Sequence, residues 1–339
     1  MNTKSNIYDL KLSDFPAVVE DLGLKKYAAN QIISWLYKKR VSGFDEMTNL
    51  TKAVRETLNQ KFTCEALKID KTLEAKDGTK KYRFKLSDGE LIEAVDMPME
   101  KRRTVCISTQ VGCAMNCAVC RTATLGLKRN LTQGEIVGQL LTIMNQNATP
   151  VTNVVLMGMG EPLANYEAVK GAVEIMIDTR AIEMSYRRVT LSTCGLIPEL
   201  KRFVNDLPVM IAISLSATTD EVRSKIMPIN KKYSIAKIME FCREHSKDSK
   251  NRITIEYVLI GDVNDSKEDA ARLVKLLRGV KAKINLIPFN SFEGCEYKSP
   301  SEEIVDFWYR FLHEKGIQTN VRVSRGHEIM AACGQLISV

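Results

Sequence analysis

Apolar residues recur at steps of three and four along the first 65 residues, the spacing of one face of an α-helix. This pattern predicts short amphipathic helices over 17–40 and 51–62. We assign 1–65 to a small helical N-terminal domain, 66–100 to a linker and β-hairpin, and 101–339 to the main domain. The hairpin is predicted over 80–97, because polar and apolar residues alternate on both sides of Ser87-Asp88-Gly89.

From about residue 103, strand-like runs alternate with helical patterns. The strands are expected at 103–109, 153–159, 188–193, 209–215, 252–260, 283–289 and 318–324, and the helices at 131–146, 165–178, 197–206, within 218–246, 266–279 and 301–316. Strands that are apolar on both faces and alternate with helices indicate a parallel sheet. The six units are too few for an eight-stranded barrel, so a doubly wound sheet and an incomplete barrel both fit the pattern.

In both architectures, active and ligand-binding sites lie at the carboxyl ends of the strands. Chemically capable residues stand at these positions. Glycines that let a ligand approach the backbone follow the second strand together with a carboxylate, and serines and an asparagine end later strands. The residues are Gly158, Gly160, Glu161, Ser192, Ser214, Leu215, Ser216 and Asn290. No GxGxxG or GxxxxGK[ST] motif is present, so neither a Rossmann nor a P-loop nucleotide site is supported.

Composition and charge narrow the class of protein. The 339 residues are 45% hydrophobic and 27% charged, which is ordinary for a globular domain and excludes a wholly disordered or coiled-coil chain. No window approaches the roughly 18 apolar residues of a membrane-spanning helix, and the first residues have no apolar signal region. We therefore expect a cytoplasmic protein. The net charge of +8 permits binding to nucleic acid without specifying it.

Nine cysteines are unexpected in a reducing compartment, where structural disulfides are rare. Cys113, Cys117 and Cys120 form a C-x3-C-x2-C run. A closed zinc site needs a fourth ligand, and the only histidines, His245, His313 and His327, are distant in sequence. Three thiolates on a four-iron cluster instead leave one iron open to bind a ligand. The cysteine run therefore favours an iron–sulfur cluster.

The run and its surroundings resemble the radical S-adenosylmethionine superfamily, and in detail the RlmN/Cfr family of RNA adenosine methyltransferases. The similarity extends from about residue 80 to the C-terminus and is fainter before it. The motifs that carry it are CISTQVGCAMNCAVC, GLKRNLTQGEIVGQ, NVVLMGMGEPLANY, RRVTLSTCG, MPINKKY, IEYVLIGDVNDS, KINLIPFN and AACGQL.

The resemblance implies a partial (β/α)6 barrel of the radical SAM type with a small helical N-terminal domain. It implies that Cys113, Cys117 and Cys120 ligate a [4Fe-4S] cluster. Cys333 and Cys106 match the family's catalytic cysteines and Glu93 its proton acceptor. The positions matching S-adenosylmethionine contacts are Gly160, Glu161, Ser192, Ser214, Leu215, Ser216 and Asn290.

The implied reaction uses two molecules of S-adenosylmethionine per turnover. One methylates Cys333, and the second is cleaved at the cluster to a radical that takes a hydrogen from the S-methyl group. The resulting carbon radical adds to carbon 2 of an adenine, and the adduct is released through a transient Cys106–Cys333 disulfide. The implied substrates are 23S rRNA and the tRNA adenosine beside the anticodon. The implied donor is a flavodoxin or ferredoxin, and we expect a monomer without a membrane partner.

Two residues depart from the family pattern, and three alternatives stay open. Ser216 replaces a usual histidine, and Val119 a usual aromatic residue. Pro162 favours the RlmN branch over Cfr, which methylates carbon 8. The alternatives are a Cfr-type enzyme, an iron–sulfur RNA-binding or redox-sensing protein without turnover, and a zinc-ribbon RNA binder.

Basic residues predicted as RNA contacts are Lys25, Lys26, Lys38, Lys39, Arg40, Lys80, Lys81, Lys101, Arg102, Arg103, Lys128, Arg129, Arg187, Arg188, Lys231 and Lys232.

Overall fold

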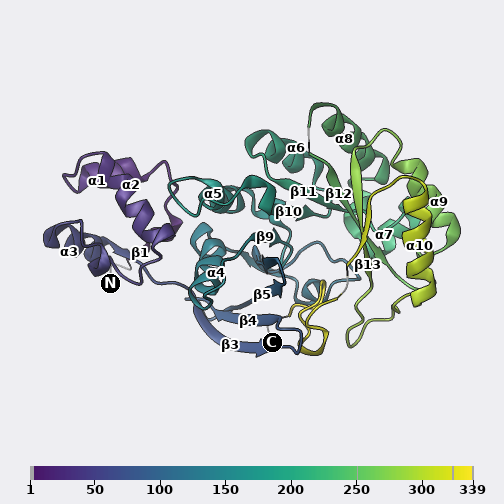
Figure 1. The fold of residues 1–339 in the computed structure, drawn as a ribbon, viewed down its shortest axis with the longest axis horizontal. Coiled ribbons are helices and arrows are strands. Elements are labelled where there is room, and N and C mark those ends of the chain that lie inside the picture. Colours follow the sequence, from purple (N-terminus) through teal and green to yellow (C-terminus); the bar gives the residue numbers. More distant parts are fainter. Residues whose placement is uncertain (1–3, 250, 323, 338–339) are drawn as a thin grey trace.

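Short helices form one end of the molecule (Figure 1), in a computed structural model that describes residues 4–249, 251–322 and 324–337. The helices are α1 (Phe15–Asp21), α2 (Tyr27–Ile33) and α3 (Lys52–Lys61), and α2 continues into a π-helical turn over Ser34–Lys38. A two-residue strand, β1 (Ser5–Asn6), pairs with β2 (Phe62–Thr63) and brings the two ends of this segment together. The predicted boundaries of 1–65 stay a prediction, and residues 1–3 lie outside the described part.

An antiparallel unit follows, made of β3 (Lys68–Glu74), β4 (Lys80–Lys85) and β5 (Leu91–Met99). The β4–β5 hairpin turns at the predicted Ser87-Asp88-Gly89, where Gly89 has a φ of 89° that favours glycine. β5 pairs antiparallel with β6 (Arg102–Cys106), the first strand of the main domain. The hairpin is therefore part of the same sheet as the main domain, rather than a separate module.

Parallel strands continue this sheet across the main domain. They are β9 (Asn153–Leu156), β10 (Val189–Thr193), β11 (Met210–Ser214), β12 (Ile253–Leu259), β13 (Ala282–Pro288) and β14 (Thr319–Val321). Their order in the described part of the chain is β14-β13-β12-β11-β10-β9-β6-β5-β4-β3. The helices between them are α4 (Gln133–Asn145), α5 (Tyr166–Ile177), α6 (Ile197–Asp206), α7 (Asp220–Ile226), α8 (Ile235–Asp248), α9 (Lys267–Leu276) and α10 (Glu302–Glu314).

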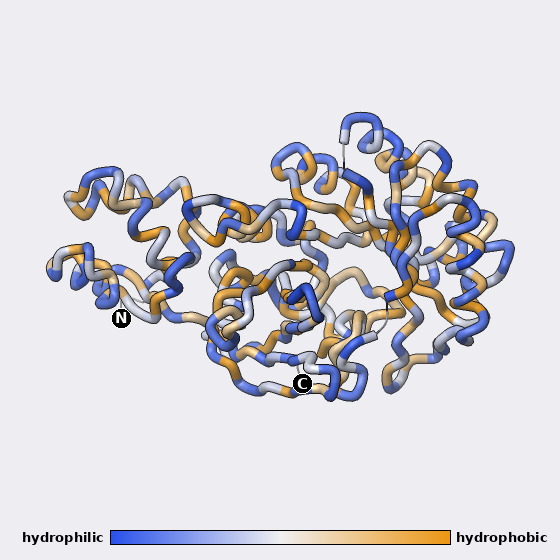
Figure 2. The backbone as a smooth tube through the Cα atoms, in the orientation of Figure 1, coloured by the Kyte–Doolittle hydropathy of each residue, from blue (hydrophilic) through white to orange (hydrophobic). Residues whose placement is uncertain are grey.

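The main domain is thus six βα units from β6 to α10, closed by β14. Apolar residues are concentrated along the central strands, and hydrophilic residues lie at the outer ends of the helices (Figure 2). The strand interiors are fully buried at Val105, Val154, Leu191, Ile213 and Ile255. None of the helices in the described part is long and apolar enough to span a membrane.

The structure differs from the sequence-based elements at a few places. β3 was not predicted, because its residues are mostly exposed and polar and carry no apolar face. The helix expected within 218–246 is two helices, α7 and α8, separated by Pro228. The strand expected at 153–159 ends at Leu156, since the following glycine-rich residues turn towards the site described below. The strand expected at 318–324 includes residue 323, which lies outside the described residues.

Candidate active site

A cavity of about 200 Å³ opens at the carboxyl ends of the parallel strands. Most of the predicted site residues line it, although they come from seven separate segments of the chain. These residues are Cys106, Cys113, Cys117, Cys120, Gly160, Glu161, Ser192, Ser214, Ser216, Asn290 and Cys333. Two predicted residues do not line it. Leu215 is turned into the core, and Glu93 faces a neighbouring cavity.

The three clustered cysteines lie on one wall, in the loop after the short strand β7 (Gln110–Gly112). β7 pairs with β8 (Leu127–Asn130), and the Cys113 amide donates to the Gly126 carbonyl at 2.8 Å. A Cβ on Gly112 would lie 1.8 Å from this same Gly126 oxygen, so only glycine fits there. The backbone between Gly112 and Gly126 is therefore closed into a tight loop that carries the three thiols.

Among the described residues, no three His, Cys, Asp or Glu side chains converge closely enough to hold a single metal ion. A single zinc ion requires all its thiolate sulfurs within about 2.3 Å of one point. The three thiols line the same cavity without meeting that condition. What disfavours the zinc ribbon is still the sequence, which offers no fourth ligand near the three cysteines.

The loop after β9 fits tightly against β7. A Cβ on Gly160 would lie 2.6 Å from the Gln110 side chain, and one on Gly158 would lie 2.7 Å from the Ile107 backbone. The Gln110 side-chain oxygen also accepts from the Glu161 amide at 2.9 Å. Both glycines line the cavity, and the protein itself already requires glycine at each position, while the predicted close approach of a ligand stays a prediction.

Glu161 uses its carboxylate on the backbone. Its two oxygens accept from the amides of Leu163, at 3.1 Å, and Cys194, at 2.8 Å. Burial raises the pKa of this carboxyl, and these hydrogen bonds oppose the shift. The side chain therefore fixes the strand end that carries Ser192 next to the loop that carries Gly160.

Two residues of the cavity floor were missed by the sequence analysis. Glu256 of β12 accepts from the Ser192 hydroxyl at 2.8 Å, and its other oxygen lies 3.6 Å from a guanidinium nitrogen of Arg322. That oxygen is buried and has no hydrogen-bond partner within the described protein. Beside its ion pair with Arg322, this buried oxygen can therefore still accept a hydrogen bond from a ligand in the cavity. A carboxylate in the middle of the apolar run ITIEYVL was the signal that could have identified it.

Asn290 and Ser216 hold backbone around the cavity. The Asn290 amide donates to the Cys333 carbonyl at 3.2 Å, and its oxygen accepts from the Ser324 hydroxyl. Ser216 has a left-handed backbone, with a φ of 50°, and its carbonyl accepts from the Asn264 side chain at 2.7 Å. Asn290 thus links the carboxyl end of β13 to the segment that carries Cys333.

The C-terminal segment, residues 324–337, closes the cavity. The Gly334 carbonyl accepts from the Arg121 amide at 2.7 Å, and the Leu336 carbonyl accepts from the Thr122 hydroxyl at 2.7 Å. Both donors directly follow the last cysteine of the cluster loop. The segment also runs beside the β3–β5 unit, where it is drawn in yellow in Figure 1.

Cys106 and Cys333, far apart in sequence, face the same cavity as free thiols. Cys106 ends β6 and is 8% exposed, whereas Cys333 is exposed to the interior of the cavity. Burial among protein atoms raises the pKa of the Cys106 thiol to about 12, and the same cause raises that of Cys333 to about 11. The structure therefore brings the two predicted catalytic thiols to one site.

Glu93 lies on β5 and lines a second cavity of about 390 Å³. Its carboxylate forms an ion pair with Lys81 of β4 at 3.2 Å and accepts from the Ile337 amide at 3.0 Å. Burial raises the pKa of Glu93, and Lys81 opposes that shift. The C-terminal segment lines both cavities, the first with residues that include Cys333 and Leu336 and the second with residues that include Met330 and Ile337, so the two cavities are neighbours.

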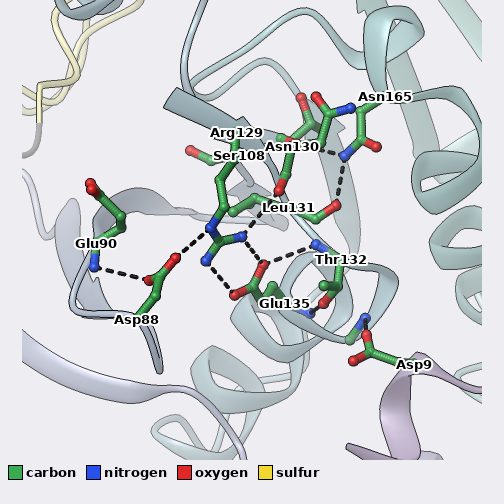
Figure 3. Close-up of polar contacts among 12 residues, drawn as sticks. Asp9, Asp88, Glu90, Ser108, Arg129, Asn130, Leu131, Thr132, Glu135 and Asn165 are labelled. Atoms are coloured by element: carbon green, nitrogen blue, oxygen red, sulfur yellow. Dashed lines mark hydrogen bonds and ion pairs between the residues drawn. The ribbon is translucent and has the colours of Figure 1, made fainter. Parts of the chain in front are cut away.

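The hairpin that carries Glu93 is fixed to the cluster loop by ion pairs (Figure 3). Arg129 of β8 donates to Asp88 in the hairpin turn at 2.5 Å and binds both oxygens of Glu135 at 2.8 and 2.9 Å. Glu135 also completes a capping box with Thr132 at the start of α4. Lys128 pairs with Glu90 at 2.8 Å. Two basic residues that were predicted as RNA contacts are thus engaged in internal ion pairs.

Two family models match the chain. Residues 5–64 match the ribosomal RNA large subunit methyltransferase N-terminal domain, and residues 107–274 match the radical SAM superfamily. The dual-specificity RNA methyltransferase RlmN of Geobacter sulfurreducens is 46% identical over 99% of this chain and 93% of its own. The chain belongs to the RlmN family. The predicted family is therefore confirmed, and with it a radical SAM RNA methyltransferase.

Further comparisons agree with this family. An RlmN from Desulfosudis oleivorans is 47% identical over 91% of this chain and 84% of its own. The crystal structure of a radical SAM methyltransferase from Sphaerobacter thermophilus superposes with a TM-score of 0.93 at 39% identity, covering 98% of both chains. These matches confirm the predicted fold class, a partial α/β barrel of the radical SAM type with an N-terminal domain of the RlmN kind.

The RlmN family implies a [4Fe-4S] cluster and S-adenosylmethionine, and the cavity fits both. Three thiols share one wall, which is the ligand set for a cluster with one open iron. On the opposite floor, the unpartnered oxygen of Glu256 offers an acceptor for a polar ligand. The remaining wall is largely apolar, with Met157, Val258 and Phe289. This combination suits a molecule with an apolar base and polar hydroxyl groups.

Proposed function

We propose that this chain methylates carbon 2 of adenosine in 23S rRNA and in tRNA, at the adenosine beside the anticodon. The observation that carries the proposal is the shared cavity of Cys106, Cys333 and the three clustered cysteines. An iron–sulfur sensor or a zinc ribbon has no need for two further thiols in that cavity. The printed name of the relatives, dual-specificity RNA methyltransferase, supports more than one RNA substrate.

In this proposal Cys113, Cys117 and Cys120 hold the cluster, while Gly160, Glu161, Ser192, Ser214, Ser216 and Asn290 surround S-adenosylmethionine, with Leu215 supporting them from the core. When bound, the cluster supplies the electron that cleaves S-adenosylmethionine. Glu161 and Glu256 serve the site by orientation, since each carboxylate joins two strand ends that meet at the cavity.

Two thiols of the chain divide the work: Cys333 carries the methyl group, and Cys106 releases the product. Cys333, exposed in the cavity, accepts a methyl group on sulfur, which then provides the carbon that bonds to adenine. For that bond to form, the S-methyl group would give up a hydrogen atom to the radical that cleavage of the second S-adenosylmethionine provides, and the carbon would add to carbon 2 of adenine. Glu93 accepts the proton from carbon 2, and the unpaired electron of the adduct would return to the bound cluster. The Cys106 thiolate then attacks the Cys333 sulfur, a disulfide forms, and the sulfur–carbon bond breaks with its electron pair on the carbon, which takes a proton to become the methyl product. The disulfide is reduced before the next turnover.

Further parts of the proposal concern conditions and partners. Two S-adenosylmethionine molecules are consumed per turnover, one for Cys333 and one for cleavage. A reduced flavodoxin or ferredoxin supplies electrons, and the protein acts as a monomer in the cytoplasm, where thiols are kept reduced. The target adenine must leave the RNA stack to reach the cavity.

The decisive experiment is digestion of RNA to nucleosides after incubation with the reconstituted enzyme, S-adenosylmethionine and a reductant. We expect 2-methyladenosine in 23S rRNA fragments and in tRNA. 8-Methyladenosine would instead establish the Cfr-type activity, and the absence of any methylated adenosine would overturn the proposal. Mass spectrometry of Cys333 is the companion measurement, with one added methyl group expected before RNA is supplied. Cys106→Ala is expected to accumulate a covalent protein–RNA adduct.

A further inference from the structure

Lys81 is a buried lysine beside the proposed proton acceptor. Its side chain on β4 is 8% exposed, and lysine is almost never buried without a partner. The ammonium lies 3.2 Å from an oxygen of Glu93 and donates to the Met330 carbonyl at 3.2 Å. Lys81 therefore contacts both Glu93, on the neighbouring strand β5, and the segment that carries Cys333.

The second oxygen of Glu93 completes the connection. It accepts from the Ile337 amide at 3.0 Å, so the C-terminal segment is held on both sides of Cys333, at Met330 and at Ile337. Both contacts pass through the Lys81–Glu93 pair, and Glu93 is 4% exposed. The position of the carboxylate is therefore coupled to the position of the loop that presents Cys333.

We propose that Lys81 is a positioning residue for the methyl transfer to RNA, which sets the orientation of Glu93 relative to the segment carrying Cys333. The inference rests on the proposed function, in which Glu93 accepts a proton from the Cys333–adenine adduct. It assigns Lys81, which the sequence placed among the candidate RNA contacts, to the interior of the site instead.

The charges around Glu93 support this role. The groups that face it are Lys81 and Arg83 from β4, Lys71 from β3, Arg121 after the cluster loop and Glu328 from the C-terminal segment. Burial raises the pKa of Glu93, and Lys81 is the strongest opposing influence. Without Lys81 the pKa of Glu93 rises further, so at a given pH a smaller share of the carboxyl groups is ionised and able to accept a proton.

Stability alone is a weak reason for such a pair. The desolvation of two buried charges offsets most of their attraction, and apolar replacements of similar size are often neutral or stabilising. Lys81 and Glu93 both line the second cavity, beside the segment that carries Cys333, and a requirement for charge there explains the buried pair better. The proposal therefore predicts that charge matters more than size at position 81.

The test compares Lys81→Met, Lys81→Arg and the control Lys85→Met, whose lysine is the exposed last residue of the same strand, β4. For Lys81→Met we expect methyladenosine formation to fall by about 10-fold or more, within the range of lost acid–base catalysis. We expect Cys333 methylation to stay at the wild-type level and a covalent protein–RNA adduct to accumulate on denaturing gels. Lys81→Arg should restore part of the rate, and Lys85→Met should behave as wild type.

The pH profile separates positioning from simple loss of packing. The ionised carboxylate is the active form, so raising its pKa moves the acidic limb of the rate profile of Lys81→Met to higher pH. In a Glu93→Gln background, Lys81→Met should cause no further loss, because it acts through Glu93. Equal additional loss in that background, or an unchanged limb, would overturn the proposal.

The experiment distinguishes misfolding of the Lys81→Met variant from failure of the proposed methyltransferase function. If Lys81→Met unfolds, then Lys81→Arg and the double variant Lys81→Met/Glu93→Gln, which buries no unpaired charge, still decide the question. If Cys106→Ala traps no adduct and the wild type yields no methyladenosine, the proposed function is wrong. If Cys106→Ala traps the adduct while Lys81→Met resolves it at the wild-type rate, only the role of Lys81 is wrong.

Discussion

The two thiols of the cavity differ in access although both belong to one proposed reaction. Cys333 is exposed to the cavity, whereas Cys106 lies at the end of a buried strand. Protein atoms surround both, and burial raises the pKa of each above the ordinary thiol value of 9.0. The first thiol must meet an incoming methyl donor, while the second only needs to reach the sulfur of the first.

This difference predicts the order of alkylation in the folded protein. Iodoacetamide should modify Cys333 before Cys106, and the rate at Cys333 should still rise with pH beyond 9, because the pKa of its thiol is raised to about 11. Peptide mass spectrometry across pH 7 to about 10 measures both rates. In urea both rates should level off near the ordinary thiol pKa, and levelling near pH 9 in the folded protein would contradict the prediction.

Single residues were predicted from the sequence where a motif specified them. The three cluster cysteines, Cys106 and Cys333 all reached one cavity. What the sequence could not predict was the partner of each side chain. Glu161, whose predicted ligand contact stays a prediction, also accepts two backbone amides, and Glu256 was overlooked because its partners, Ser192 and Arg322, are remote in the chain.

At the scale of elements, the cluster loop depends on a strand pair of seven residues. Gly112, which directly precedes the first cluster cysteine, lies against the Gly126 carbonyl at the point where β7 and β8 pair. Any side chain at position 112 must displace that carbonyl, and the φ of 76° at this residue is also unfavourable for other residues. The shape of the cysteine loop is therefore set by its closure rather than by its interior.

Gly112→Ala is expected to impair cluster binding. Its Cβ would lie 1.8 Å from the Gly126 oxygen, so the loop must open and the three thiols must move apart. Iron content and visible absorbance after anaerobic reconstitution measure the loss, and we expect well below half of the wild-type iron. Gly126→Ala is the matched control, since nothing lies within 4 Å of its added Cβ, and it should cost about 1–3 kcal/mol for its backbone, with φ 63° and ψ −176°, which favours glycine.

Helices and strands whose apolar residues recur at regular spacing were predicted well from the sequence. Strands made mostly of polar residues were not. The helices from α4 to α10 and the parallel strands follow patterns that bury one or both faces. β3 lacks such a pattern, because it is an edge strand whose side chains face solvent, and β8 is equally polar. Their existence depends on pairing with β4 and β7, which is a tertiary effect.

For the whole molecule, the N-terminal helices are attached to the barrel through α4. The buried side chain of Gln133 donates to the carbonyls of Tyr8, at 3.1 Å, and Leu10, at 2.8 Å, and Asp9 accepts from the Gly134 amide at 2.8 Å. Lys38 pairs with Glu183 of the barrel at 2.8 Å. Lys38, one of the basic residues of this segment, therefore helps to attach the N-terminal helices to the barrel.

The basic residues that stay exposed are expected to bind RNA. Lys25 and Lys26 precede α2, beside the exposed ring of Tyr27. Replacing both lysines with glutamate should weaken RNA binding and reduce the salt dependence of log Kd by about 1.5–2. Methylation of Cys333 without RNA should not change. Lys247→Glu, on exposed α8 of the barrel, is the control, and equal weakening by this variant would contradict a specific role for the N-terminal helices.

The docking of residues 334–336 on Arg121 and Thr122 has a consequence for assembly of the holoenzyme. The cluster loop is synthesised long before the segment that carries Cys333, and that segment forms the outer wall of the cavity. Iron and sulfide must therefore enter before the wall closes, or the wall must open again to admit them. Loading of the cluster is therefore tied to the docking of residues 334–336, which must either follow it or be reversed while it takes place.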